Sequence, residues 1–285
     1  ARAHDPSPEV AIRECATPAE TLDLAFAHLR RAPASAAPKL TATRPIPGRL
    51  WQQMLDVPGG QLRIQRNDEA AGRHIVVVHD AAGSSDTVAT LASSFIGHRP
   101  VLAIDLPGHG ESDNTLPRGP LTDALGIRAC DIVGVRGGGL VGLELAHLTP
   151  RRVHRLVLVG PMYFDKALQT GLRQHYAPEI RIDGHGGHLL QAWQFIRDQG
   201  LFWPWYARTR EGILRVAPPV DPARVQRHVL EIFRAPDLWR RAYRAHFSYP
   251  VKTRLRTVKV ATLLAAAEWD PMHACGLAAS KALPH

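Results

Sequence analysis

Cysteine, aromatic residues and long apolar runs are all scarce in this chain of 285 residues. The three cysteines, Cys15, Cys130 and Cys275, are odd in number and too widely spaced for a disulfide framework or a zinc knuckle, so we interpret them as reduced thiols. No apolar run approaches the roughly 18 residues that cross a bilayer, which argues against a transmembrane segment. No basic stretch followed by an apolar one resembles a secretory signal. We therefore expect a cytoplasmic protein without a membrane partner.

The net charge of +9 is concentrated in one part of the chain. Residues 173–256 contain 15 Lys/Arg against seven Asp/Glu, and these are spread through a segment with helical spacing rather than gathered in a run. Because no nucleic-acid-binding motif accompanies the charge, a nucleic-acid partner is not expected. The surplus favours a basic lid that attracts an anionic substrate, and an arginine-rich solvated surface is the alternative.

The composition is that of a globular protein, with one large domain and an N-terminal extension. Residues 1–48 form the extension: a helix opens at residues 17–20 and a proline-rich linker follows. Residues 50–57 and 61–65, separated by a Pro-Gly-Gly turn, predict an antiparallel hairpin.

Continuous β-branched runs then recur between helical stretches, which is typical of a mostly parallel sheet with helices on both faces. The runs are residues 74–79, 101–105, 131–134, 155–159 and 258–264. Between the fourth and the fifth of these runs, residues 165–256 contain no strand-like run. They predict an inserted helical cap before the last strand. The core then comprises residues 49–164 and 257–285.

Three loops follow three of these strands, at residues 79–84, 105–112 and 134–146. The carboxyl ends of parallel strands meet at one edge of a sheet, so the three loops converge on a single mouth. In the first loop, small residues after His79 can turn free backbone N–H groups toward an anion.

Together these features resemble the α/β-hydrolase superfamily, in the lid-bearing group that includes esterases, epoxide hydrolases and carbon–carbon bond hydrolases. The resemblance maps the family's Gly-x-Ser-x-Gly elbow onto residues 134–138, so that Arg136 stands where the family has its nucleophilic serine. A guanidinium stays protonated and can neither attack a carbonyl nor act as a base. The resemblance therefore implies a degenerate nucleophile elbow, with Arg136 as an anchor for an anion.

The same resemblance implies further site residues. Asp270 matches the acid of the family's triad, and the family's histidine would lie beyond His285. The oxyanion hole would be made by the backbone N–H groups of Ala81 and Gly137. Asp80 replaces the family's usual glycine, and it either repels an oxyanion or pairs with Arg136. An inward-turned Arg136 paired with Asp270, Asp80 or Glu111 is the alternative to an anion anchor.

Within the cap, His185 and His188 could share a metal or hold a substrate carboxylate if a helix begins near Gly186. No third ligand is placed by spacing, so we predict neither a metal nor another cofactor. His185, His188 and Trp193 are interpreted as lining the substrate pocket, with a plain surface loop as the alternative.

Three hypotheses of function follow. The first is a hydrolase-type enzyme that acts on a small carbonyl or ester substrate, with an acidic compound favoured. It works by a non-serine route in which a histidine with Asp270 activates water. The second is an inactive homologue that binds a ligand or a partner. The third is hydrolysis by another nucleophile, Ser84 or Asp80. A homodimer is left open.

Overall fold

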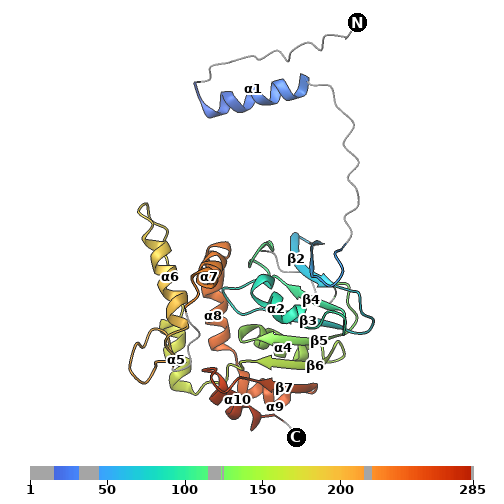
Figure 1. Ribbon diagram of the computed structural model, residues 1–285, viewed down its shortest axis with the longest axis vertical. Coiled ribbons are helices and arrows are strands. Elements are labelled where there is room, and N and C mark those ends of the chain that lie inside the picture. Colours follow the sequence, from blue (N-terminus) through green and yellow to red (C-terminus); the bar gives the residue numbers. More distant parts are fainter. Residues whose placement is uncertain (1–15, 32–44, 115–122, 124, 215–219, 284–285) are drawn as a thin grey trace. The chain divides into compact units, whose positions relative to one another are not determined.

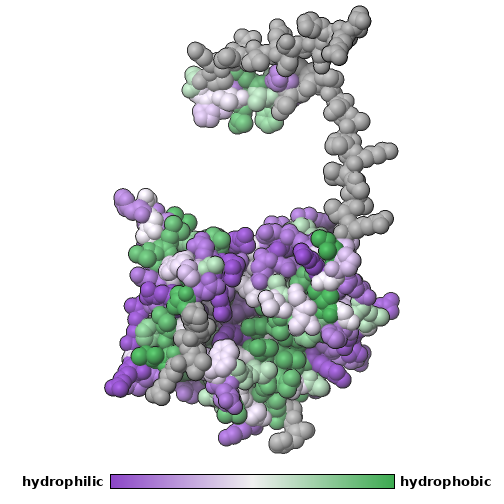
Figure 2. Space-filling model, in the orientation of Figure 1, coloured by the Kyte–Doolittle hydropathy of each residue, from purple (hydrophilic) through white to green (hydrophobic). Residues whose placement is uncertain are grey.

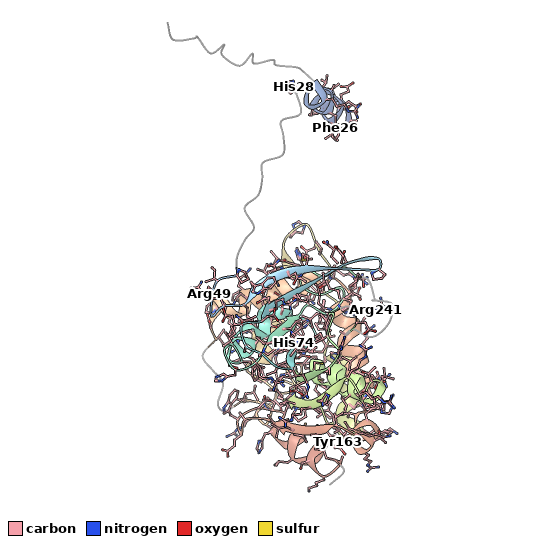
Figure 3. All side chains as sticks on the ribbon, turned by 90° about the vertical axis from the view of Figure 1, so that its right-hand side faces the viewer. Phe26, His28, Arg49, His74, Tyr163 and Arg241 are labelled. Atoms are coloured by element: carbon pink, nitrogen blue, oxygen red, sulfur yellow. The ribbon has the colours of Figure 1, made fainter. Side chains whose placement is uncertain are left out.

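The computed structural model describes residues 16–31, 45–114, 123, 125–214 and 220–283. The chain divides into two units, Ala1–Arg44 and Pro45–His285. In the first unit helix α1 (Pro18–Arg31) begins as predicted, because the Thr17 and Glu20 side chains each accept a hydrogen bond from the other's backbone N–H, at 3.2 and 3.3 Å. Phe26 of α1 is exposed and is labelled in Figure 3. Cys15 and most of the predicted linker lie outside the described residues.

The second unit is built on a seven-stranded sheet with the order β1-β2-β4-β3-β5-β6-β7 (Figure 1). Strands β3 to β7 run parallel, and β1 and β2 form the predicted antiparallel hairpin at one edge. The strands are β1 (Trp51–Val57), β2 (Gly60–Asn67), β3 (His74–Val78), β4 (Val101–Ile104), β5 (Cys130–Val135), β6 (Val153–Val159) and β7 (Ala261–Ala265).

Helices cover both faces of this sheet because successive side chains of a strand point to opposite sides. In β3, Val76 and Val78 belong to the larger apolar cluster with α4 (Gly137–Leu148), whereas Ile75 and Val77 belong to a second cluster with α2 (Ala89–Ser93). The continuous apolar runs in the sequence thus reflect strands that are buried on both faces, and the predicted fold class is confirmed.

Between β6 and β7 the described residues form a group of helices, in the segment where the sequence predicts a cap, and this segment is called the cap below. The helices are α5 (Lys166–His175), α6 (Gly187–Gln199), α7 (Pro222–Arg234), α8 (Leu238–Ser248) and α9 (Val251–Thr257). Helix α8 is amphipathic: Trp239, Tyr243 and Phe247 are buried, while Arg241 lies on its exposed side (Figure 3). None of the described helices is both long and apolar enough to cross a membrane.

Strand β7 is shorter than predicted. The apolar run was expected to be extended from residue 258, but pairing with β6 starts at Ala261, opposite Arg155. Helix α9 continues to Thr257, and Val258 is buried at its end instead of joining the sheet. Helix α10 (His273–Ser280) follows β7.

One carboxylate ties the cap to the core. Glu144 of α4 accepts hydrogen bonds from the hydroxyl of Tyr249 at 2.5 Å and from Nε and Nη2 of Arg254 at 2.9 and 3.0 Å. Nη1 of Arg254 also lies 2.9 Å from Nε2 of His147. The segment that returns the chain from the cap to the sheet is therefore attached to the helix that follows β5.

Candidate active site

The candidate site lies where the chain changes direction across the sheet. Strand β3 has β4 on one side and β5 on the other, so the loops that leave β3 and β5 diverge and open a crevice at the carboxyl edge. Asp80 comes after β3 and Arg136 after β5. The topology alone thus brings these two charged residues together.

Arg136 occupies a tight turn between β5 and α4. Its backbone has φ 48° and ψ −111°, a conformation that residues other than glycine seldom adopt and that is often found at functional sites. A Cβ atom on Gly138 would lie 2.3 Å from the Val78 carbonyl oxygen, and one on Gly134 would lie 2.4 Å from the Gly139 Cα. The turn packs backbone against backbone, which explains why glycines flank Arg136.

The Arg136 side chain reaches Asp270, which follows β7. Its Nη2 donates to both carboxylate oxygens at 3.3 and 3.4 Å, and Oδ1 of Asp270 also accepts from the Met272 N–H at 2.8 Å. Burial works against the charged guanidinium, but Asp270 and Asp80 outweigh it and raise the pKa of Arg136. Among the described residues, Nε and Nη1 have no hydrogen-bond partner, and 35% of the side chain is exposed. The arginine is oriented by Asp270 and keeps free donors.

Asp80 lies on the two N–H groups that the resemblance assigns to an oxyanion hole. Its Oδ1 accepts from Ala81 N at 2.8 Å and from Gly137 N at 3.0 Å. The two donors do point to one position, as expected of such a hole, but an oxygen of the protein itself occupies it. A direct hydrogen bond from Arg136 to Asp80 is not formed.

The proton affinities around Asp80 are the reverse of the usual order. Burial raises the pKa of the Asp80 carboxyl to about 6, although Arg136 and the two N–H groups act in the opposite direction. Burial, with His109 and His79 nearby, lowers the pKa of His246 to about 4. Burial and His109 lower that of His79 to about 4 as well, despite its hydrogen bond to the Asp80 carbonyl. The carboxyl group thus holds a proton more tightly than either imidazole.

A cavity of about 340 Å³ opens above these residues, between the cap and the sheet. Figure 2 shows it as a recess between the cap on the left and the sheet on the right. Asp80 and Arg136 form its floor; Tyr176, Tyr243 and Trp203 are among its apolar walls. Its charged or titratable lining further includes Arg197, Asp221, Arg224 and His228.

The cap residues predicted to line the pocket lie elsewhere. His185, His188 and Trp193 are not among the described residues that form the cavity wall. The helix α6 does begin at Gly187, but the Asp183 carboxylate accepts from the backbone N–H groups of His185, Gly187 and His188, which makes the histidine pair part of a helix-start loop. Their role in substrate binding stays a prediction without support from this geometry.

Two further residues named in the predictions lie away from the cavity or from Arg136. Ser84 is fully buried, and its hydroxyl accepts from the Asp86 N–H as the cap of a short 3₁₀ helix, so it does not face the cavity. Glu111 contacts Gln52 and Arg63 rather than Arg136. Within residues 16–31, 45–114, 123, 125–214 and 220–283, no histidine hydrogen-bonds to Asp270, and no group of three or more His, Cys, Asp or Glu side chains could hold a metal.

Sequence reasoning missed His246 of α8. Its Nδ1 lies 3.9 Å from Oδ1 of Asp80, only 10% of its side chain is exposed, and its ring fills the space beside Gly137. One signal could have found it: His246 follows Trp239 and Tyr243 on the buried face of α8 at helical spacing. A histidine in an otherwise aromatic stripe of the cap indicates a position above the strand ends.

Comparisons with known proteins agree with this architecture. No family model matches the chain. It is 32% identical over 126 residues to an acetyltransferase component of an acetoin-cleaving system from Pseudomonas putida, covering 41% of this chain and 34% of that protein. It is 30% identical over 187 residues to a candidate carbamate hydrolase, RutD, from Variovorax paradoxus, covering 62% of this chain and 65% of the relative. The chain thus spans about a third of the length of the first relative.

A solved structure extends the likeness over most of the fold. The 2-hydroxy-6-oxo-6-phenylhexa-2,4-dienoate hydrolase from Rhodococcus sp. strain RHA1 superimposes with a TM-score of 0.57 at 17% identity, over 83% of this chain and 88% of that one. At this identity the likeness concerns the fold alone. With the sheet order and the strand-turn-helix at Arg136, it shows that the chain has the α/β-hydrolase fold. The likeness to RutD adds a hydrolase to the relatives in sequence.

Proposed function

We propose that this protein is a hydrolase-type enzyme for a small anionic carbonyl compound or ester, that it works by a non-serine route, and that Arg136 anchors the anion. The resemblance places the serine nucleophile of the superfamily at the β5–α4 turn, and here that turn presents a guanidinium. One observation carries the proposal. The guanidinium is oriented by the hydrogen bonds from one nitrogen to Asp270, and its other nitrogens are free at the cavity floor.

Free donors matter because of the geometry of the guanidinium group. Of the five N–H donors of this planar fork, three belong to Nε and Nη1, and each of them can donate a charge-assisted hydrogen bond to an anion in the cavity. Asp270 holds the fork in place, so less side-chain entropy is lost when a ligand binds. An anion in the cavity would complete a carboxylate–guanidinium–carboxylate arrangement.

The cavity wall carries charges of both signs, with arginine in excess, which supports an acidic ligand. Arg197 is paired with Asp198, with Nη2 to Oδ1 at 2.6 Å, whereas Arg224 forms no ion pair with the described part of the chain. Asp221, the N-cap of α7, adds a carboxylate to this wall, so that the described lining holds three arginines against two aspartates. The hydrolase of similar fold is named for a dienoate, which is itself a carboxylate.

Binding without turnover is the second candidate function, and one observation favours it. The expected oxyanion donors are occupied by Asp80. A fold that had lost catalysis and kept its ligand would look similar at this position.

The proposed anchor is tested by replacing it. In Arg136→Ala we expect the dissociation constant for a small dicarboxylate such as succinate to rise at least about tenfold, because a hydrogen-bonded ion pair contributes about 1.5 to 3 kcal/mol. Arg241→Ala is the matched control, since it removes one arginine from the exposed side of α8 and should change the constant less than about twofold. Calorimetry at low salt measures both. Equal affinities in the wild type and Arg136→Ala would reject the anchor.

Hydrolysis is measured in parallel with 4-nitrophenyl hydrogen succinate, an ester that carries a free carboxylate, and with neutral 4-nitrophenyl acetate. We expect turnover of the succinate ester to depend on Arg136, with a lower kcat/KM in Arg136→Ala. Succinate binding without hydrolysis of either ester would favour the second candidate function.

A further inference from the structure

Asp80 is built into the site in a way that the anion anchor does not require. It is held by two backbone N–H groups at 2.8 and 3.0 Å, yet 23% of its side chain is still exposed and it forms part of the cavity floor. A hydrogen-bonded carboxylate of this kind is fixed in position but remains accessible to a molecule in the cavity. Neither the elbow nor the packing of the sheet needs a charge at this place.

The neighbours of Asp80 leave it without a counter-ion in direct contact. His246 lies on its far side, with Nδ1 at 3.9 Å and without a hydrogen-bond partner in the part of the chain that the structure describes. At neutral pH this imidazole is uncharged, because burial lowers its pKa. The groups that face the Asp80 carboxylate are Arg136 from the elbow, Tyr176 after α5, and Tyr243 and His246 from α8. His79, directly after β3, contacts the Asp80 backbone carbonyl.

We propose that Asp80 is the general base of the reaction, and that it activates a water molecule in the cavity instead of a serine at the elbow. This assignment rests on the proposed function. His246 is a positioning residue, since its ring covers the carboxylate and keeps bulk water away from it. The proton affinity fits the role, because a base works best when its pKa is near the working pH and burial brings that of Asp80 to about 6.

The step balances without a cofactor. Asp80 removes a proton from water as the water oxygen forms a bond to the substrate carbonyl carbon, and the carbonyl electron pair moves to its oxygen. Arg136 has three N–H donors that Asp270 leaves free, and one that the substrate carboxylate does not use stabilises the negative oxygen, because Ala81 and Gly137 are already engaged. When the tetrahedral species collapses, the bond to the leaving group breaks and the leaving oxygen takes the proton from Asp80.

The same geometry leaves one oxygen of Asp80 for the reaction, and isotope labelling separates a base from a nucleophile. Direct attack by the carboxylate would need Asp80 to turn an oxygen toward the carbonyl carbon and to form an anhydride. Its Oδ1 is engaged with Ala81 N and Gly137 N in the strand-end turn. A water molecule can approach the other oxygen without breaking either hydrogen bond.

Asp80→Asn is the decisive variant. The amide oxygen can accept the same two backbone hydrogen bonds, so the turn is preserved, but the side chain cannot take a proton. With 4-nitrophenyl hydrogen succinate we expect kcat to fall at least about 100-fold while KM changes less than about threefold. For the wild type, kcat/KM should rise with pH to a plateau with a midpoint near the pKa of Asp80, about 6. Asp165→Asn, which exchanges the exposed N-cap of α5 for another good N-cap outside the cavity, is the matched control and should keep wild-type kinetics.

The outcomes separate the two proposals. If the wild type hydrolyses the ester and Asp80→Asn does so at the same rate, the base assignment is overturned and the proposed function stands. If the wild type is inactive while succinate still binds, the proposed hydrolysis fails, and Asp80 fails with it as its base. A single turnover in H₂¹⁸O that leaves ¹⁸O in Asp80 would replace the base by a nucleophile. Succinate binding by Asp80→Asn shows that the variant is folded.

Discussion

The floor of the cavity, formed by the β5–α4 turn and the strand ends on which it packs, and its roof, formed by helix α8, are packed in different ways. At the floor, backbone atoms of the β5–α4 turn pack on the ends of the strands, so that a Cβ on Gly138 would meet carbonyl oxygens at 2.3 and 2.4 Å. At the roof, α8 contributes large side chains, and Tyr243 and Phe247 stack at 5.8 Å between ring centroids. The floor is specified by the absence of side chains and the roof by their shape. The floor should therefore tolerate substitution far less than the roof does.

Adding one methyl group to the floor is expected to have the largest effect. Gly138→Ala forces backbone atoms of the turn and of β3 apart, and we expect a loss of about 3 kcal/mol or more in the free energy of unfolding. Gly184→Ala is the control, because a Cβ there meets no atom within 4 Å. Urea denaturation should show that variant within about 1 kcal/mol of the wild type. A fully stable Gly138→Ala would mean that the floor can move.

The dependence of stability on pH tests the floor and the roof together, because each contains one buried histidine. His79 and His246 both have a pKa near 4 in the folded chain against an ordinary value of 6.5, so the unfolded chain binds the extra protons. The free energy of unfolding should fall as the pH drops below 6.5, by about 2 kcal/mol for each histidine at pH 5. Because the pKa of Asp80 is raised, the folded chain binds that proton more tightly, which offsets roughly 1 kcal/mol of the loss. The net loss at pH 5 is then about 3 kcal/mol.

Thermal unfolding of the wild type and His246→Gln between pH 5 and pH 8 measures this dependence. The variant removes the contribution of the roof and should reduce the loss by about 2 kcal/mol, to about a third of the wild-type value. An unchanged pH dependence would show that His246 titrates normally and that the roof does not exclude water from Asp80.

Removing part of a roof side chain should have the smallest effect of these. Phe247→Leu keeps an apolar group in the aromatic cluster around Tyr176 and Tyr243, and nearby side chains can close part of the space. We expect a loss of about 1 to 2 kcal/mol by urea denaturation, with succinate affinity little changed. A loss larger than that of Gly138→Ala would reverse the comparison.

The parts of the fold that depend on local pattern could be predicted from the sequence. Continuous β-branched runs located the parallel strands, and the Pro-Gly-Gly turn located the hairpin. The boundary of β7 could not, because Val258 is apolar both when it ends a helix and when it begins a strand. Only the tertiary position of α9 decides between the two.

In the candidate site too, the features that depend on local sequence could be predicted, and those that depend on tertiary packing could not. The tight turn at Arg136 follows from its flanking glycines, and the Arg136–Asp270 pair was one of the alternatives that the charges allowed. The placement of Asp80 on both N–H donors depends on a side-chain rotamer, and the approach of His246 depends on how α8 crosses the strand ends. His185 and His188 lie away from the cavity because Asp183 uses their backbone to start α6. Sequence spacing carries none of this information.

The attachment of Tyr249 and Arg254 to Glu144 has a mechanical meaning. The three side chains join the returning end of the cap to α4, and α4 starts at the turn that holds Arg136. A tilt of the cap that widens the entrance must either break three hydrogen bonds or pull on that helix. As long as these hydrogen bonds hold, admission of a ligand and alignment of the arginine are coupled.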